Sequence, residues 1–580
     1  MRITRMQSTG SRMTAQHTFL GLDRSERTPD GAWTDMTNMT GRRYPALATR
    51  GPRRTVRTLN APAGMLAKDA LAVVEGSGVV YNGHTVELNL STDPAMCPKQ
   101  LISMGAYLLI WPDKKYLNTQ DLTDKGSMER TFTLGASAAV SARLCRADGA
   151  EYGAYTVSPQ PPEDPAHGAL WMDTSEAAVP VLKEWSGDSD MWVTIPTTYV
   201  KLSAANVGQG FSLYDGVTVS GLTGDMAAFN GSHVLYAVDT GCIVIPGVMR
   251  TAELTQTGGL TVSRTVPDMD FVTECGNRIW GCKYGMAGGR TVNEIYASKL
   301  GDFKNWSCTM GLATDSYAAS RGSDGVFTGA VTHLGHPLFF REDCVEKVYP
   351  SDSGAHRIVT VECRGVQKGC WRSLAIVGET LYYKSRSGVC AYTGSLPRSV
   401  SEALGDQVFS DARAGAWGDE YWLSMRSGDG SWHLFTYDTA RRLWHRQDGT
   451  KAMAFARSGG SLYWIDEDSS ALICADGDRE NPFTWSVTSG AMDLGLAENE
   501  YVSRFVIRCD TAGHIALHVR YDEDGGWLDR GTVIMNGLGS FVLPVSPRRC
   551  DHLRIRLTGD APCRIYSIAR WVERGSDAFR

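Results

Sequence analysis

Short runs in which apolar and polar residues alternate recur along most of the chain, separated by Gly- or Asn-containing turns. The clearest unit is residues 421–449. Two apolar stretches, 421–425 and 432–437, flank a polar Gly turn, and a corner leads on to Trp444. Alternation with a period of two around such a turn predicts a β-hairpin. Two successive hairpins give about four short strands, the size of one β-propeller blade.

Similar units recur from about residue 64 onward, at a spacing of roughly 30 to 50 residues, which is typical of propeller blades. They lie at 71–81, 101–117, 228–245, 271–306, 329–349, 374–392, 416–444 and 452–474. No long stretch with a helical period competes with them. We therefore expect an all-β protein built on a β-propeller, and the irregular spacing leaves the number of blades open.

The first 54 residues have a different pattern. Between 19 and 54 the apolar residues are isolated, which is typical of an extended segment lying across another surface. We expect residues 1–54 to form an N-terminal arm that contacts a neighbouring subunit, because isolated apolar side chains have nothing local to bury against. Its expected anchors are Trp33, Met36, Met39, Tyr44 and Leu47. On this interpretation, deletion of residues 1–54 leaves a folded protein that cannot assemble.

Two further regions depart from the repeat. A proline-rich linker and a compact aromatic segment interrupt it, which predicts a small inserted β module at 135–215 and places the propeller at 55–134 and 216–480. In this module Trp171, Trp185 and Trp192 are either the core of the module or an aromatic platform for a sugar. After residue 480, regular short strands with turn signals between them predict a C-terminal β-sandwich at 481–580.

Length, charge and cysteine content limit the classes of protein that this chain can belong to. The 580 residues suggest two to four domains. The net charge of −6 argues against a surface coated by nucleic acid, although it is compatible with an acidic channel through which DNA passes. The 14 cysteines include no Cys-x-x-Cys pair, which favours buried thiols over a zinc site. The sequence shows neither a signal peptide nor a membrane-spanning run.

No catalytic motif stands out. We find no nucleophile elbow, no phosphate-binding loop and no pair of carboxylates marked by a motif. Residues 427–432, Ser-Gly-Asp-Gly-Ser-Trp, approach the Asp-box of sialidase-type propellers, which stabilises a turn and performs no chemistry. The sequence therefore predicts a protein that is not an enzyme, with no cofactor and no metal.

Several segments together resemble phage structural proteins of the tail nozzle and packaged-DNA stabilisation family. Residues 19–23 (FLGLD), 35–39 (DMTNM) and 44–47 (YPAL) resemble the family's opening segment. Residues 295–306, 338–348 and 434–446 resemble its blade motifs. The segment 168–192 is similar to a small module found among phage tail proteins.

The resemblance implies a virion structural protein that is made in the host cytoplasm. Such subunits form rings, commonly hexameric, below the portal and adaptor, and their lumen retains genomic DNA and later conducts it without sequence-specific contact. The arm and the sandwich would then be the contact surfaces. Two alternatives stay open. One is a glycan-binding or glycan-cleaving propeller at the tail tip, acting through Trp171, Trp185 or Trp192 or a carboxylate pair. The other is a cellular propeller scaffold.

Overall fold

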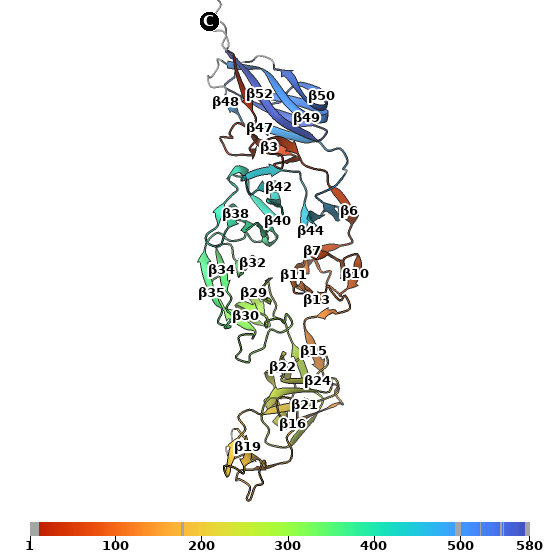
Figure 1. Cartoon of the computed structure of the whole chain (residues 1–580), viewed down its shortest axis with the longest axis vertical. Coiled ribbons are helices and arrows are strands. Elements are labelled where there is room, and N and C mark those ends of the chain that lie inside the picture. The colour runs from red at the N-terminus through yellow and green to blue at the C-terminus, as the bar shows by residue number, and fades with distance from the viewer. Residues whose placement is uncertain are drawn as a thin grey trace, which may run out of the picture.

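The computed structural model describes residues 11–175, 179–478, 480–493, 500–522, 524–545, 548 and 550–574. The molecule is elongated, with a C-terminal sandwich at one end, a propeller in the middle and an insertion at the other end (Figure 1). Regular structure in the described residues is almost entirely strand, which confirms the predicted all-β class. The helical segments there are short 3₁₀ turns: η1 (Pro94–Met96), η2 (Gly224–Phe229), η3 (Trp371–Ser373) and η4 (Glu402–Leu404).

Seven four-stranded antiparallel blades form the propeller within the described residues; six are separate sheets, and the sixth blade is part of a larger sheet. The first two blades are β7 (Pro62–Lys68), β8 (Ala70–Glu75), β9 (Gly78–Tyr81) and β10 (His84–Glu87), then β11 (Gln100–Met104), β12 (Tyr107–Trp111), β13 (Lys115–Asn118) and β14 (Lys125–Ser127). The third and fourth are β28 (Phe271–Cys275), β29 (Arg278–Ala287), β30 (Arg290–Ala297) and β31 (Tyr317–Ser320), then β32 (Gly329–His333), β33 (His336–Phe340), β34 (Cys344–Tyr349) and β35 (Arg357–Glu362). The fifth and sixth are β36 (Ala375–Val377), β37 (Thr380–Ser385), β38 (Gly388–Tyr392) and β39 (Arg398–Ser399), then β40 (Phe409–Trp417), β41 (Glu420–Ser427), β42 (Trp432–Asp438) and β43 (Leu443–Arg446).

The seventh blade closes the ring with strands from both ends of the propeller sequence. It contains β44 (Ala452–Ser458), β45 (Ser461–Asp466), β46 (Ala471–Cys474) and, from the N-terminal side, β6 (Arg54–Thr58). β6 pairs antiparallel with β46, with Thr58 opposite Ala471 and Arg54 opposite Cys474. The innermost strands β44 and β7 are in contact, so the circle is complete. Closure packs the last blade against the first, so neither is left with an uncovered sheet face, and only short strand edges remain.

The insertion between the second and third blades contains three sheets. The first is β15 (Arg130–Thr133), β27 (Thr261–Arg264), β22 (Gly216–Ser220) and β23 (Gly231–Val234). The second is β24 (Ala237–Asp239), β25 (Cys242–Pro246), β21 (Tyr199–Ser203), β16 (Ala139–Cys145) and β26 (Glu253–Thr257). The third, at the distal tip, is β17 (Tyr155–Ser158), β18 (Leu170–Asp173), β19 (Val181–Ser186) and β20 (Met191–Thr194).

The insertion is longer than the predicted 135–215. It begins at β15 and ends at β27, so residues 216–264, expected to be propeller, belong to it. The segment 228–245 has the local pattern of a blade, yet its strands pair with β22 and β21 of the insertion. Alternation predicts a strand but does not say which sheet the strand joins, and this is why the boundary differs.

The C-terminal sandwich is built around one long strand. Its strands are β47 (Trp485–Ser489), β48 (Met492–Asp493), β49 (Glu500–Tyr521), β50 (Leu528–Pro544), β51 (His552–Gly559) and β52 (Cys563–Arg574). The first half of β49 pairs with β52 and the second half with β51, while β50 runs along its other side. Strict alternation in β49 turns Phe505, Ile507, Ile515 and Leu517 into the core between the two halves.

Strands from the N-terminal segment complete this sandwich. They are β1 (Ser11–Gln16), β2 (Gly21–Leu22), β3 (Ala32–Thr37), β4 (Met39–Thr40) and β5 (Leu47–Thr49). β1 and β5 pair with β52, and β3 pairs with β47. β2 pairs with both β3 and β43, so one continuous sheet runs from the sandwich into the sixth blade.

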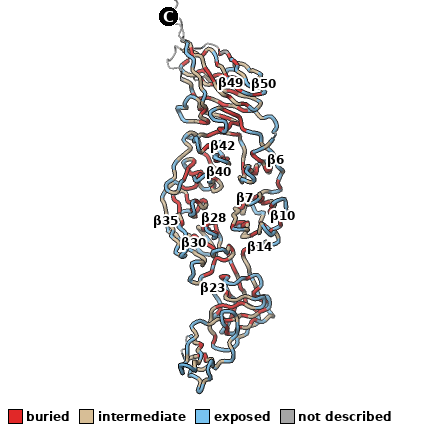
Figure 2. The backbone as a smooth tube through the Cα atoms, viewed as in Figure 1, coloured by how far each residue is buried: buried red, intermediate tan, exposed pale blue. Residues whose placement is uncertain are grey.

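This packing corrects the expected arm. Trp33, Met36, Met39 and Leu47 are 0–2% exposed and lie in the core shared with the sandwich and the sixth blade, where Figure 2 shows a buried band. Tyr44 is 38% exposed. The isolated apolar residues do have nothing local to bury against, but the surface that covers them comes from a distant part of the same chain. Four of the five expected anchors are therefore not available to a neighbouring subunit.

Candidate functional site

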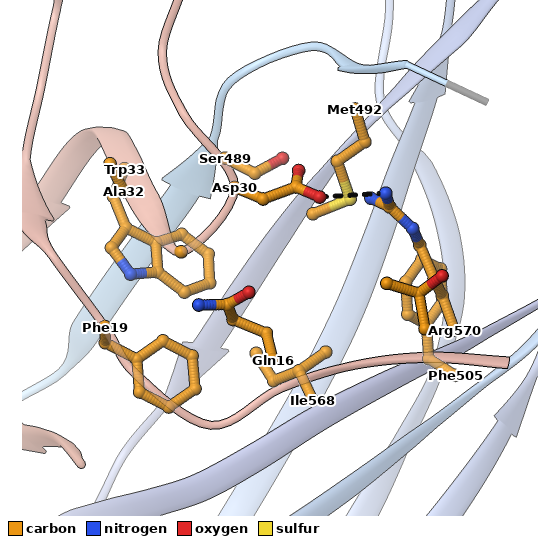
Figure 3. A pocket seen from close by; sticks show the side chains of 12 residues that line it. Gln16, Phe19, Asp30, Ala32, Trp33, Ser489, Met492, Phe505, Ile568 and Arg570 are labelled. Atoms are coloured by element: carbon orange, nitrogen blue, oxygen red, sulfur yellow. Dashed lines mark hydrogen bonds and ion pairs between the residues drawn. The ribbon is translucent and has the colours of Figure 1, made fainter. Parts of the chain in front are cut away.

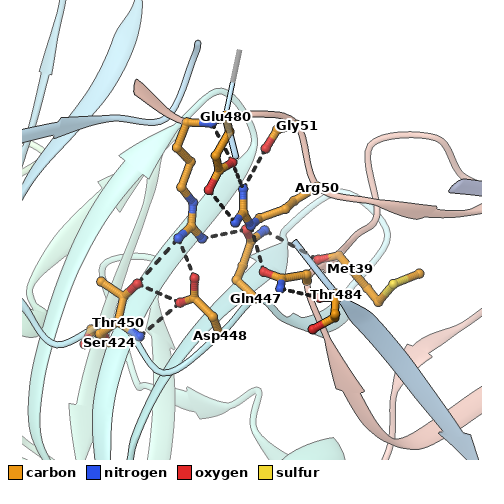
Figure 4. A network of polar contacts seen from close by, with 11 residues as sticks. Met39, Arg50, Gly51, Ser424, Gln447, Asp448, Thr450, Glu480 and Thr484 are labelled. Atoms are coloured by element: carbon orange, nitrogen blue, oxygen red, sulfur yellow. Dashed lines mark hydrogen bonds and ion pairs between the residues drawn. The ribbon is translucent and has the colours of Figure 1, made fainter. Parts of the chain in front are cut away.

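A polar network fixes the junction of the N-terminal segment, the sixth blade and the chain leading to the sandwich (Figure 4). Arg50 donates through both terminal nitrogens to the two carboxylate oxygens of Glu480, and its Nε donates to Asn38 Oδ1 at 2.7 Å. The backbone N–H of Arg53 donates to the same carboxylate at 2.9 Å. Burial opposes ionisation of Glu480, but these hydrogen bonds and the Arg50 charge hold its pKa below the ordinary value.

The second half of this network locks the turn after the sixth blade. The Arg53 side chain forms an ion pair with Asp448 and donates to Gln447 Oε1 at 3.1 Å. Desolvation lowers the pKa of Arg53 and opposes the ionisation of Asp448, whose pKa is nevertheless lowered by the Arg53 charge and by Thr450. The two arginine side chains of the network are largely buried, whereas the two carboxylates are each 25% exposed, and together they connect the N-terminal segment, the sixth blade and the chain leading to the sandwich.

A small apolar cavity lies between β1, β3 and the sandwich (Figure 3). Phe19, Trp33, Phe505 and Ile568 line it, with polar side chains at its rim, and Arg570 forms an ion pair with Asp30 at 2.9 Å there. Its volume is about 40 Å³. Ligand pockets usually measure ~300–1,000 Å³, so this cavity is a packing space and no substrate site.

The hairpin turn between β41 and β42 brings Ser, Asp and His side chains together. Asp429 Oδ1 accepts hydrogen bonds from the backbone N–H of Ser431 at 2.9 Å and from its hydroxyl at 2.7 Å. His433 Nε2 lies 3.1 Å from that hydroxyl. A catalytic triad needs the carboxylate on the other imidazole nitrogen, which here has no partner. The contacts are those of a stabilised turn, as expected from the Asp-box-like sequence.

Burial keeps His433 neutral, since its pKa is lowered to about 4 by desolvation and by Arg446 and Arg24. Over the described ranges, no cluster of three or more His, Cys, Asp or Glu side chains is arranged to hold a metal ion. No helix in that part of the chain is long and apolar enough to cross a membrane.

The three tryptophans of the distal tip meet on the β18–β20 hairpins. The Trp192 ring lies 5.3 Å from both Trp171 and Trp185, edge-on to each. Trp171 is 5% exposed and its indole N–H donates to Ser158 O at 2.9 Å, so it is a core residue. Trp185 and Trp192 form a directly opposite cross-strand pair and are half-buried. The structure thus unites the three residues and leaves two of them partly open to solvent.

Several strands of the sandwich pair on one side only in the described part of the chain, and β50 and β1 are the two longest of them. β50 pairs with β49 alone, and β1 pairs with β52 alone. They are the two ends of the strand order β50–β49–β52–β1. β50 also exposes Ile534 (74%), Leu538 (58%) and Val542 (52%) on one face.

The outer face of the sheet formed by β51 and the second half of β49 carries a group of side chains that the sequence analysis missed, which we call the arginine face. It consists of His518, Arg520, Trp527, Arg554 and Arg556. The first two lie on β49 and the last two on β51, each alternating with a buried apolar residue. The alternation of cations with apolar residues, and the absence of lysine from residues 481–580, were signals visible in the sequence.

Comparison with known proteins identifies no family. No family model matches the chain, and no curated protein matches it. Among solved structures, an exo-β-1,3-galactanase from Phanerochaete chrysosporium aligns over 52% of this chain and 94% of its own, with 9% identity and a TM-score of 0.19. The endosialidase of phage phi92 aligns over 91% of this chain and 75% of its own, with 10% identity and a TM-score of 0.22. These likenesses are too low to support any argument about function.

Proposed function

We propose that the chain is a non-enzymatic structural subunit of a bacteriophage tail. In this proposal it forms a nozzle-like homohexameric ring below the portal and adaptor, and the lumen retains genomic DNA and then conducts it. The observation that carries the proposal is the pair of free sheet edges, β50 and β1, at opposite ends of one strand order in the sandwich. The motifs that resemble phage nozzle proteins support the same assignment.

Free edges on opposite sides suit a heterologous contact. A strand edge offers unpaired N–H and C=O groups that can pair with another strand. If β50 of one subunit meets β1 of the next, the same contact repeats from subunit to subunit, and it closes into a ring when the rotation allows. Ile534, Leu538 and Val542 supply apolar area on β50, and Met13, 56% exposed, supplies it on β1.

The subunit also has the rigidity that a tube wall needs. One continuous sheet joins the sandwich to the sixth blade, and β6 closes the seventh blade. The paired charges at the junction, Arg50 with Glu480 and Arg53 with Asp448, oppose rotation of one part against the other. Elongated subunits of this kind, side by side with parallel long axes, would make a ring with a tall wall.

The test measures mass by light scattering and inspects the same fractions by negative stain. We expect rings with a central hole wide enough for duplex DNA, and single subunits for an Ile534→Asp/Leu538→Asp variant. The matched control is Met286→Asp/Leu396→Asp, which places the same charges on exposed apolar positions of the propeller, 66% and 64% exposed. Rings that survive the β50 changes would refute the edge contact. A chain that stays monomeric alone and with its portal partner would refute the ring.

A second candidate function is glycan binding at the distal tip. The observation that favours it is the half-buried pair Trp185 and Trp192, packed against Trp171 on the sheet farthest from the sandwich (Figure 1). A glycan array probed with the full chain and with a Trp185→Ala/Trp192→Ala variant tests it. Binding that disappears in the variant would support this function, and an array without hits would exclude glycan recognition by the tip.

A further inference from the structure

The arginine face has a regular geometry. β49 and β51 are neighbouring antiparallel strands, and their register places His518 opposite Arg556 and Arg520 opposite Arg554. Residues directly opposite on one sheet face lie close together, so these four side chains form a compact grid. The Trp527 ring lies beside it, with the guanidinium of Arg556 at 4.4 Å and that of Arg520 at 5.4 Å from its centre.

Within the described residues, the grid has no carboxylate counter-ion. Over the described ranges, no carboxylate lies within ion-pair distance of Arg520, Arg554 or Arg556. Arg556 Nε donates a hydrogen bond to Thr488 Oγ1 at 3.2 Å. Arg548 of the same sandwich, by contrast, donates to both oxygens of Asp524. Like charges directly opposite each other destabilise a sheet, so an anion bound at the arginine face would relieve the repulsion between its side chains.

The neighbouring row on the same face offers hydroxyl groups. Thr37, Ser486, Thr558, Ala516 and Thr532 stand opposite one another in register across five strands. They line a shallow groove of about 510 Å³. Arginine guanidinium groups and threonine and serine hydroxyls are groups with which proteins hold a phosphate backbone. Because the row runs across five neighbouring strands, the surface suits an extended ligand.

We propose that the arginine face binds the phosphate backbone of duplex DNA, mainly through Arg520, Arg554 and Arg556, without reading base sequence. This extends the proposed function and rests on it, because a tail ring is what brings DNA within reach of the sandwich. The net charge of −6 and the acidic character elsewhere would confine adhesion to this face. Loose, salt-sensitive contact of this kind allows DNA to slide.

The test titrates the full chain with a short fluorescein-labelled duplex at several salt concentrations and follows anisotropy. The variant is Arg520→Gln/Arg554→Gln. Its matched control, Arg504→Gln/Arg508→Gln, removes the same charge from the exposed outer face of the other half of β49. Each phosphate contact contributes about 0.9 to the slope of log affinity against log salt, so we expect the slope to fall by about 2 in the variant and to stay unchanged in the control.

An additional variant and two further measurements complete the test. An Arg520→Lys/Arg554→Lys variant keeps the charge and should keep the slope, which covers the case in which the glutamine variant folds poorly. Equal slopes for wild type and both glutamine variants would overturn the proposal. So would preferential binding of poly-glutamate, which would mark the face as a site for an acidic protein. Light scattering on the same samples separates the two proposals: rings without DNA binding refute the arginine face, and DNA binding by a permanent monomer refutes the ring.

Discussion

Truncation of Met36 distinguishes an N-terminal segment that belongs to the fold from an arm that serves a neighbour. Met36 is 0% exposed in β3 and lies in the core that joins the sandwich to the sixth blade. Met36→Ala removes a fully buried side chain whose burial is worth about 1.5–3 kcal/mol, and it leaves a cavity. Substitutions of this kind cost roughly 2–5 kcal/mol, and we expect about 3 kcal/mol here because the surrounding strands are paired on both sides and cannot collapse.

Urea unfolding followed by tryptophan fluorescence measures this change, because Trp33 and Trp485 lie in the same core. Tyr44→Ala is the control within the segment. Tyr44 is 38% exposed and its ring lies 5.2 Å from the Arg441 guanidinium, so its loss should cost within about 1 kcal/mol. If Met36→Ala were no more destabilising than Tyr44→Ala and yet abolished assembly, the segment would be an arm after all.

Four further predictions follow from the same contacts. Deletion of residues 1–54 should unfold the sandwich, because it removes β1 and β5 from β52 and β3 from β47. Limited proteolysis should then show rapid cleavage within 481–580. A sandwich that resists the protease would contradict the prediction. Gly21→Ala should destabilise the protein by at least about 2 kcal/mol, because Gly21 has φ +75° and a Cβ there would collide with the backbone oxygen of Trp444. The control Gly83→Ala, at φ +79° in open space, should cost only about 1–2 kcal/mol of backbone strain. Equal losses in denaturant midpoint for the two variants would refute the role of the contact with Trp444. Burial lowers the pKa of His445 to about 4, so the stability gained by burying the neutral imidazole is complete above the unfolded pKa of about 6.5 and is lost as pH falls toward 4. His445→Gln should flatten the pH dependence of the free energy of unfolding in that window. An unchanged profile would exclude His445 as the source of this pH dependence. Glu480→Gln should cost roughly 1–3 kcal/mol, because Arg50, whose side chain is 6% exposed, loses its charged partner; a stability equal to wild type would show that the junction does not depend on this pair.

Local features of this protein were readable from the sequence. The unit at 421–449 supplies three of the four strands of its blade, β41, β42 and β43, with Tyr421 opposite Tyr437 and Tyr437 opposite Trp444, and β40 before it is the fourth. The turn at 427–432 is held by Asp429, and residues after 480 form a sandwich. Each of these depends on period-two alternation or on turn residues within a few positions, and such signals act over the same short range as the structure they predict.

Contacts between strands far apart in the sequence could be read only from the tertiary structure. The apolar residues of the N-terminal segment were recognisable, but only the fold shows that strands more than 400 residues away cover Trp33 and Met36. The same holds for 216–264, whose strands join the insertion, and for the closure of seven blades by β6. It holds also for the arginine face, where Arg520 and Arg554 become neighbours only through the register of β49 and β51. Alternation determines which residues face a core, whereas the choice of partner strand depends on the fit of whole sheets across long loops, and a local pattern carries no information about that fit.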